Sequence, residues 1–283
     1  MYKEGRKIKN LPPMIFMTPY IMPNRNGASN LFSASVDITE AEKYLRTKRA
    51  EGKKGLGMMD VFIAAYIRTI AEFPGVNRFI RGQKIYARNG IDICLTIKKK
   101  LEISADETVV KLPAEPTDTL NDVYERLKRL IEENRLEGDQ NDMDSVARVL
   151  AHLPGVLLKF IVWFLKTLDY FGILPKHLVK LSPFHGTMFL TNIGSLGISP
   201  VYHHLYDFGN LPVFCSIGAK RCEYTINSNG DTVMKKMLEF KVVCDERICD
   251  GHYYSRVFKA LKTYLENPWL LENPPEKVER DLD

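Results

Sequence analysis

The most chemically suggestive stretch of the sequence is an acid-rich corner between a predicted strand and a predicted helix. The β-branched residues Val242 and Val243 indicate a buried strand, which ends at Asp245-Glu246-Arg247. Beyond Gly251 the apolar residues follow helical spacing as far as Asn267-Pro268. Polar groups at the end of a buried strand can perform acid–base chemistry. A solvated turn has the same composition, so the corner alone leaves both interpretations open.

Other side chains suited to proton transfer stand nearby in the sequence. His252 directly follows Gly251, and His203-His204 lie in a loop-like stretch after a glycine turn. An imidazole titrates near ~6.5, so each of these could act as a general base, although each could equally be a loop or packing histidine. His185 precedes a predicted strand, and we expect it to be structural.

Composition excludes several classes of protein. The net charge of +5 is mild and the basic residues are dispersed, so we expect no nucleic-acid partner. The cysteines are odd in number and form no CxxC pair, which predicts reduced thiols in a cytoplasmic protein and no bound metal. The start of the chain has no apolar signal core, and no run is long enough to span a membrane.

Positioning such a corner requires a sheet with helices packed on it, and the patterns predict one α/β domain over residues 1–283. We expect an irregular, proline-rich segment over 1–27 and a polar tail over 272–283. Thr39 and Glu42 form a predicted capping box, and Asp60 is the expected cap of an apolar helix. Strands are predicted at 31–37, 79, 83–86, 91–97, 108–112, 187–192, 213–219, 222–227 and 232–243, with a further helix at 119–135.

Residues 142–182 form the least usual segment, a predicted helical hairpin inserted into the domain. Its arms are 146–150 and 156–166, broken at Pro154-Gly155. Lys159 and Lys166 are seven residues apart and therefore share one helix face, with bulky apolar groups elsewhere. Three interpretations remain open: a buried helix, which we favour, a subunit interface, or a helix lying on a membrane.

Several segments together resemble a known family. The stretches 187–197 and 245–251, with the apolar strand near Val213, resemble the catalytic domain of the dihydrolipoyl acyltransferases, the core subunits of the 2-oxoacid dehydrogenase complexes. Residues 32–39 and 89–93 match in the same order, and the resemblance covers about residues 28 to 270. It implies a coenzyme A-dependent acyltransferase-like two-layer sandwich, a mixed β-sheet with helices packed on it, as in chloramphenicol acetyltransferase.

The resemblance also implies a reaction and its residues. Such enzymes move an acyl group between coenzyme A and an acceptor, and the histidine of an H-x-x-x-D-G signature takes the proton from the attacking group. Thr191 matches the hydroxyl that stabilises the oxyanion, and Asp250-Gly251 match the end of the signature. The aspartate is usually held in an ion pair, for which Arg25 is one candidate here. The histidine position holds Glu246.

Whether the chain can catalyse acyl transfer depends on the glutamate at the histidine position. A thiol titrates near ~8.5, a histidine near ~6.5 and a glutamate near ~4.3, so proton transfer to an ordinary glutamate costs roughly 3 kcal/mol more than transfer to histidine. That difference is worth on the order of a hundredfold in rate. A glutamate could serve as base only in an apolar pocket. Otherwise His252, His203 or His204 would have to replace it.

Two functions of different class therefore remain. One is a coenzyme A-dependent acyltransferase with an altered general base, acting on a thiol, hydroxyl or amine acceptor, small or protein-borne. The other is a catalytically silent homologue that binds an acyl-coenzyme A or a partner, with a membrane surface as one place where it could act. By resemblance we expect coenzyme A or acyl-coenzyme A as substrate, a homotrimer with its site between subunits, no attached lipoyl domain, and no larger cubic core.

Overall fold

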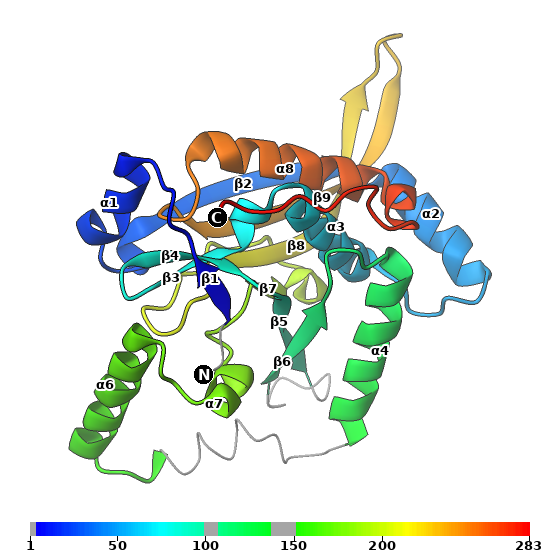
Figure 1. Cartoon of the computed structure of the whole chain (residues 1–283). Coiled ribbons are helices and arrows are strands. Elements are labelled where there is room, and N and C mark those ends of the chain that lie inside the picture. Colours follow the sequence, from blue (N-terminus) through cyan, green and yellow to red (C-terminus); the bar gives the residue numbers. More distant parts are fainter. Residues whose placement is uncertain (1–3, 99–106, 137–150) are drawn as a thin grey trace.

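A six-stranded mixed sheet carries most of the core in the computed structural model, which describes residues 4–98, 107–136 and 151–283 (Figure 1). Its strands, in spatial order, are β2 (Ser29–Asp37), β9 (Thr232–Asp245), β8 (Val213–Ile226), β7 (Met188–Asn192), β5 (Ile91–Lys98) and β6 (Glu107–Ala114). β7 runs parallel to β5 and β8, and the remaining neighbours are antiparallel. The predicted mixed sheet is confirmed.

Helices and a small second sheet surround this layer. The small antiparallel sheet contains β1 (Gly5–Lys7), β4 (Lys84–Arg88) and β3 (Arg78–Arg81). The α-helices are α1 (Pro13–Ile21), α2 (Thr39–Ala50), α3 (Met58–Glu72), α4 (Leu120–Leu136), α6 (Gly155–Phe171), α7 (Lys176–Leu181) and α8 (Gly251–Glu266). Single turns of 3₁₀ helix are η1 (Asn26–Ala28), η2 (Pro74–Asn77), η3 (Gly194–Leu196) and η4 (Pro268–Leu271).

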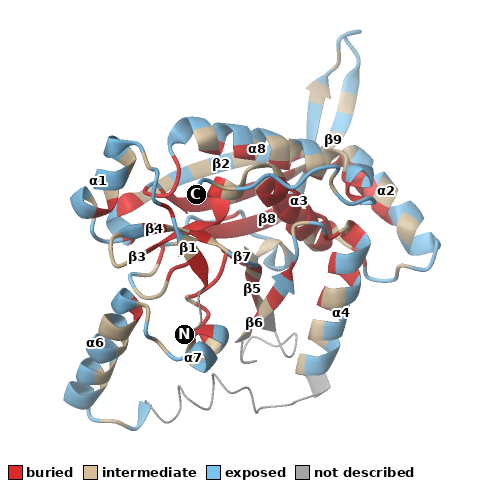
Figure 2. Cartoon of the chain, viewed as in Figure 1, coloured by how far each residue is buried: buried red, intermediate tan, exposed pale blue. Residues whose placement is uncertain are grey.

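The core lies between the sheet and α3. Almost every residue of α3 is buried, as its apolar sequence predicts, and the helix packs between α4 and α8 (Figure 2). Phe62 on α3 meets Phe240 on β9 edge to face, with ring centroids 5.2 Å apart. The arrangement is the predicted two-layer sandwich.

The start of α3 corrects one sequence expectation. Asp60 is not the cap but the third residue of the helix, and its Oδ2 accepts a hydrogen bond from the Gly57 amide at 2.8 Å. Burial raises the pKa of Asp60 to about 6, although the amide bond partly opposes that shift.

This raised pKa predicts a pH-dependent stability. Between about pH 4 and pH 6 the unfolded chain has lost the Asp60 proton while the folded chain retains it, so the free energy of unfolding falls as the pH rises. Asp60→Asn cannot ionise and keeps an oxygen for the Gly57 amide. We expect it to gain about 2–3 kcal/mol relative to the natural chain between about pH 4 and pH 7, measured by urea unfolding. A difference that does not change with pH would contradict this assignment.

Two other expectations are corrected. The segment over 1–27 is not wholly irregular, because β1 pairs with β4 and α1 begins at the proline pair. The strands expected at 213–219 and 222–227 are one strand, β8, with an irregular register between Ile217 and Lys220. The tail over 272–283 contains no helix or strand, and its Asp281 Oδ2 accepts a hydrogen bond from Arg78 Nε at 2.8 Å.

The favoured interpretation of the 142–182 insertion is wrong. Along α6 only Asp169 is buried, and the bulky apolar side chains are exposed, as the pale helix at the lower left of Figure 2 shows. The expected first arm at 146–150 lies outside the described residues. Within the described ranges, no helix has the length and apolar character needed to cross a bilayer.

Candidate active site

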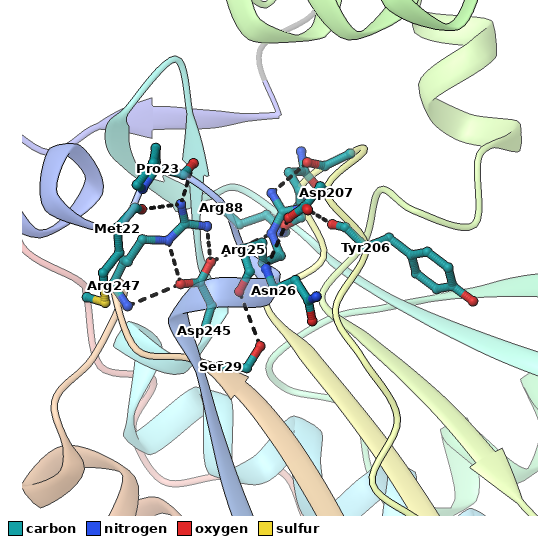
Figure 3. Close-up of polar contacts among 12 residues, drawn as sticks. Met22, Pro23, Arg25, Asn26, Ser29, Arg88, Tyr206, Asp207, Asp245 and Arg247 are labelled. Carbon is teal, nitrogen blue, oxygen red and sulfur yellow. Dashed lines mark hydrogen bonds and ion pairs between the residues drawn. The ribbon is translucent and has the colours of Figure 1, made fainter. Parts of the chain in front are cut away.

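A buried ion-pair cluster forms the corner where β9 ends. Asp245 is almost fully buried, and its two oxygens accept hydrogen bonds from Arg247, with Nε at 2.8 Å and Nη2 at 2.7 Å (Figure 3). The Nε of Arg25 lies 3.6 Å from Asp245 Oδ2 on the other side. Two buried guanidinium groups thus share one carboxylate, which partly offsets the cost of burying all three charges.

The two arginines connect this corner to distant segments. Arg25 donates to the carbonyl oxygens of Tyr206 and Gly209, both at 2.6 Å, and Arg247 donates to that of Met22 at 3.1 Å. Burial lowers the pKa of the Arg25 guanidinium, and the nearby Asp245 carboxylate opposes this shift. The cluster therefore fastens both the chain before β2 and the loop at 198–212 to the end of β9.

Glu246, the residue at the signature position, points away from this cluster. Its side chain is exposed, while its amide donates to the Ala28 carbonyl at 2.8 Å. Arg247 is buried, so the two neighbours point to opposite sides as the sequence predicts. The next signature residue, Asp250, caps α8 by accepting the Tyr253 amide at 2.8 Å.

The expected partner of Asp250 is corrected by these contacts. Arg25, one candidate for that ion pair, lies against Asp245 instead. Asp245 and the two arginines are named from the sequence, but their pairing with one another is what sequence reasoning missed. A signal was present, because an acid and a base at the end of an apolar strand need a partner when that strand end is buried.

Thr191, the proposed oxyanion donor, lies near the end of β7 and is half-buried. A tight glycine turn follows it, and a Cβ on Gly194 would lie 2.4 Å from the Gly218 carbonyl oxygen. Only glycine allows this close approach. In the sheet, Thr191 is opposite Ser216, which is opposite Lys241.

This register separates Thr191 from Glu246 within one chain. Lys241 is five residues before Glu246, roughly 17 Å along a strand, and two strand spacings add about 10 Å sideways. The two residues are thus about 19 Å apart. A single chain does not bring them together.

Two of the candidate histidines lie between these residues. His203 stacks on Phe214 of β8, with ring centroids 4.0 Å apart and an interplanar angle of 3°. Phe214 is opposite Val243, two residues along β9 from Lys241 toward the Asp245 corner. His204 is exposed, and its amide donates to His203 Nδ1 at 3.0 Å.

The other histidines lie elsewhere. His252 is exposed in the first turn of α8, where its carbonyl accepts a hydrogen bond from Ser255. His185 is buried, with Nδ1 2.8 Å from the Ser182 hydroxyl and Nε2 3.2 Å from Asp169 Oδ1. Burial lowers its pKa, and the structural role expected for His185 fits these contacts.

Comparison with known proteins supports the family resemblance and the fold. Residues 179–272, which contain Thr191, the histidine loop and the Asp245 corner, match the sequence model of the 2-oxoacid dehydrogenases acyltransferase family (catalytic domain). The resemblance is confirmed. The chain has the fold of the acyltransferase catalytic domain, and the family model matches about a third of its length. No curated protein matches the chain.

Solved structures extend the likeness of fold to nearly the whole acyltransferase-like chain. A probable dihydrolipoamide acetyltransferase from Listeria monocytogenes 4b F2365 has 16% identity and a TM-score of 0.59, over 91% of this chain and 94% of that one. The cubic core of the pyruvate dehydrogenase multienzyme complex has 13% identity and a TM-score of 0.60, over 94% of both chains. Chloramphenicol acetyltransferase has 14% identity and a TM-score of 0.55, over 92% of this chain and 99% of that one.

The ion-pair cluster leads to a prediction about stability. Asp245→Asn leaves Arg25 and Arg247 buried without their carboxylate, so we expect a loss of about 3–5 kcal/mol in the free energy of unfolding. Glu40→Gln is the matched control, because it removes an exposed ion pair with Lys43 and should cost at most about 0.5 kcal/mol. Urea denaturation measures both. Equal losses in the two variants would show that the cluster does not stabilise the fold.

Proposed function

We propose that this protein transfers an acyl group between coenzyme A and an acceptor, at sites formed between copies of the chain, with Glu246 as the general base. The observation that carries the proposal is the Asp245 cluster. It holds the backbone of the signature corner through buried ion pairs while leaving the Glu246 side chain accessible. A corner built only for stability would not need to present that carboxylate.

The chemistry follows from the positions of two side chains. The acceptor thiol or hydroxyl gives its proton to the Glu246 carboxylate and attacks the thioester carbonyl carbon. The Thr191 hydroxyl of a neighbouring copy donates a hydrogen bond to the oxyanion of the tetrahedral intermediate. When that intermediate collapses, the bond to the coenzyme A sulfur breaks, and Glu246 returns the proton to the leaving thiolate. A second copy would also cover Glu246 and exclude water from it.

The replacement of histidine by glutamate provides a direct test. Glu246→Gln removes the base, and we expect turnover to fall about 10²- to 10⁴-fold. Glu246→His supplies a more basic group, and we expect a gain approaching a hundredfold. The measurement is exchange between acetyl-coenzyme A and dihydrolipoamide, followed by mass spectrometry. The exposed Glu40→Gln is the control and should not change turnover.

Unchanged turnover in Glu246→Gln would contradict the proposed base. His203 and His204 are then the next groups to replace. His203 stacks on Phe214, whose register position in the sheet lies between those of Thr191 and Asp245. His252 comes after them, since it stands in the exposed first turn of α8.

The separation of Thr191 and Glu246 predicts complementation between inactive chains. Thr191→Val and Glu246→Gln are each expected to lose activity. In mixed trimers, however, an interface can combine the intact Glu246 of one chain with the intact Thr191 of the other. Activity should return to about a third of the sites in such trimers. The measurement is the exchange assay on co-refolded chains, with light scattering to establish the trimer. A monomeric protein, or no recovery, would contradict an interfacial site.

A second function is favoured by one observation, the exposure of Glu246 in the single chain. A glutamate that stays in water is a poor base for a thiol. In this alternative the protein binds an acyl-coenzyme A or a partner without turnover. Absence of exchange together with saturable binding of acetyl-coenzyme A in calorimetry would favour it.

A further inference from the structure

Helix α6 presents an unusually apolar surface to solvent. Val156, Trp163 and Phe171 are 85%, 59% and 67% exposed, and Phe160 and Phe164 are exposed as well. In a helix of 17 residues these five side chains fall on one broad face at 3.6 residues per turn. Lys159 and Lys166 lie together at one edge of this face. A group of large apolar side chains exposed on one helix face indicates a binding surface.

Contacts near the C-terminal end of α6 hold this helix against the rest of the molecule. Asp169, the buried residue of the helix, lies 3.2 Å from His185 Nε2 and 3.7 Å from Arg81 Nε. The Tyr170 hydroxyl also donates to Gln83 Oε1 at 3.1 Å. Burial raises the pKa of Asp169, but the contact with His185 lowers it. The net effect is a lowered pKa, so the Asp169 carboxylate stays charged. The apolar face is therefore directed outward by fixed contacts.

A second exposed apolar helix borders the same side of the molecule. Helix α1 exposes Met14, Phe16, Met17, Tyr20 and Ile21. Figure 1 shows α1 and α6 on one side of the small sheet formed by β1, β4 and β3. Between them lies a hollow of about 750 Å³, bordered by Tyr20 of α1 and by Tyr170 and Phe171 of α6.

This hollow is basic. Among the described residues that line it, every charged side chain is positive: Arg6, Lys7, Lys9, Arg81 and Lys84. The two arginines have partners, since Arg6 lies 3.3 Å from Asp283 and Arg81 binds Glu4. The three lysines are exposed.

We propose that α1 and α6 dock this protein onto the surface of a bilayer that contains anionic phospholipids. The apolar side chains of both helices enter the boundary between head groups and acyl chains, and Lys7, Lys9 and Lys84 contact the phosphates. Aromatic and aliphatic groups on one face, flanked by lysines whose stems can reach the head groups, are typical of helices that lie in the membrane interface. The basic hollow complements the negative surface potential.

Charge favours a lipid surface over a second copy of the chain. An interface between two copies related by a twofold axis would place the same basic hollow against itself, so like charges would meet. Anionic head groups neutralise these lysines instead. The proposal is independent of acyl transfer, because it uses none of the residues proposed for the reaction.

The test is co-sedimentation of the whole chain with vesicles. We expect binding to vesicles of phosphatidylcholine mixed with phosphatidylglycerol, and much weaker binding to phosphatidylcholine alone or at high salt. Replacing Lys7, Lys9 and Lys84 by glutamine should weaken binding to the mixed vesicles about a hundredfold, at about fivefold for each lysine. Trp163→Glu should weaken it on both kinds of vesicle.

A matched control and a spectroscopic readout make this test specific. Ile226 is as exposed as the α6 residues but stands in the β8–β9 hairpin that projects from the other side of the molecule (Figure 1), so Ile226→Glu should bind like the natural chain. The chain has two tryptophans, and in a Trp269→Phe background Trp163 remains alone. Its fluorescence should shift to shorter wavelength when anionic vesicles are added.

Three results would overturn the proposal. The first is no sedimentation of the natural chain with the mixed vesicles, and the second is equal binding by Trp163→Glu and Ile226→Glu. The third combines two findings: the natural chain does not bind vesicles, and it self-associates without lipid in a way that Trp163→Glu abolishes and Ile226→Glu does not. That outcome would assign the surface to a second copy.

Discussion

The carboxylate of Asp245 is the constraint on which the candidate site depends. It is buried between Arg247 and Arg25, and these arginines reach the carbonyls of the chain before β2 and of the loop at 198–212. Three segments far apart in the sequence therefore meet at one strand end. A buried charge without its partners is costly, so the three segments hold one another in place.

This corner keeps its structure whatever side chain stands at position 246. The backbone at the signature position is held by Asp245 and by the Ala28 carbonyl, and α8 begins at the capping residue Asp250. None of these contacts involves the Glu246 side chain. The side chain is therefore free to vary chemically without loss of the fold, and its identity affects only what the surface can do.

The register of the sheet also fixes the distance between Thr191 and Glu246, the two residues proposed for the reaction. Thr191 lies on β7 and Glu246 directly follows β9, with β8 between these two strands and an offset of about five residues along them. A shift of the register by one residue would turn every side chain to the opposite face. Assembly of copies, rather than movement within one chain, is the economical way to join them. Helices α1 and α6 border this corner, since the Met22 carbonyl at the end of α1 accepts a hydrogen bond from Arg247. Docking through them still uses none of the residues proposed for the reaction.

Local patterns in the sequence determined much of this protein. Apolar periodicity predicted most of the strands and the buried α3, and Asn229-Gly230 predicted the turn between β8 and β9. The resemblance, carried by the order of the motifs, implied the mixed sheet and the acyltransferase-like fold. These features follow from neighbouring residues, whose spacing is visible in the chain. Only the tertiary structure decided that Asp245, rather than Asp250, pairs with Arg25, because that contact joins residues 220 positions apart.

The tertiary structure likewise decided the exposure of α6. Its composition fits a buried helix as well as a surface one, since both are rich in Leu, Phe and Val. What distinguishes them is whether another element covers the helix, and here only its last turns are fastened, through Asp169, to His185 and Arg81. Burial is a property of the whole fold, and for such a helix it cannot be determined from the helix sequence alone.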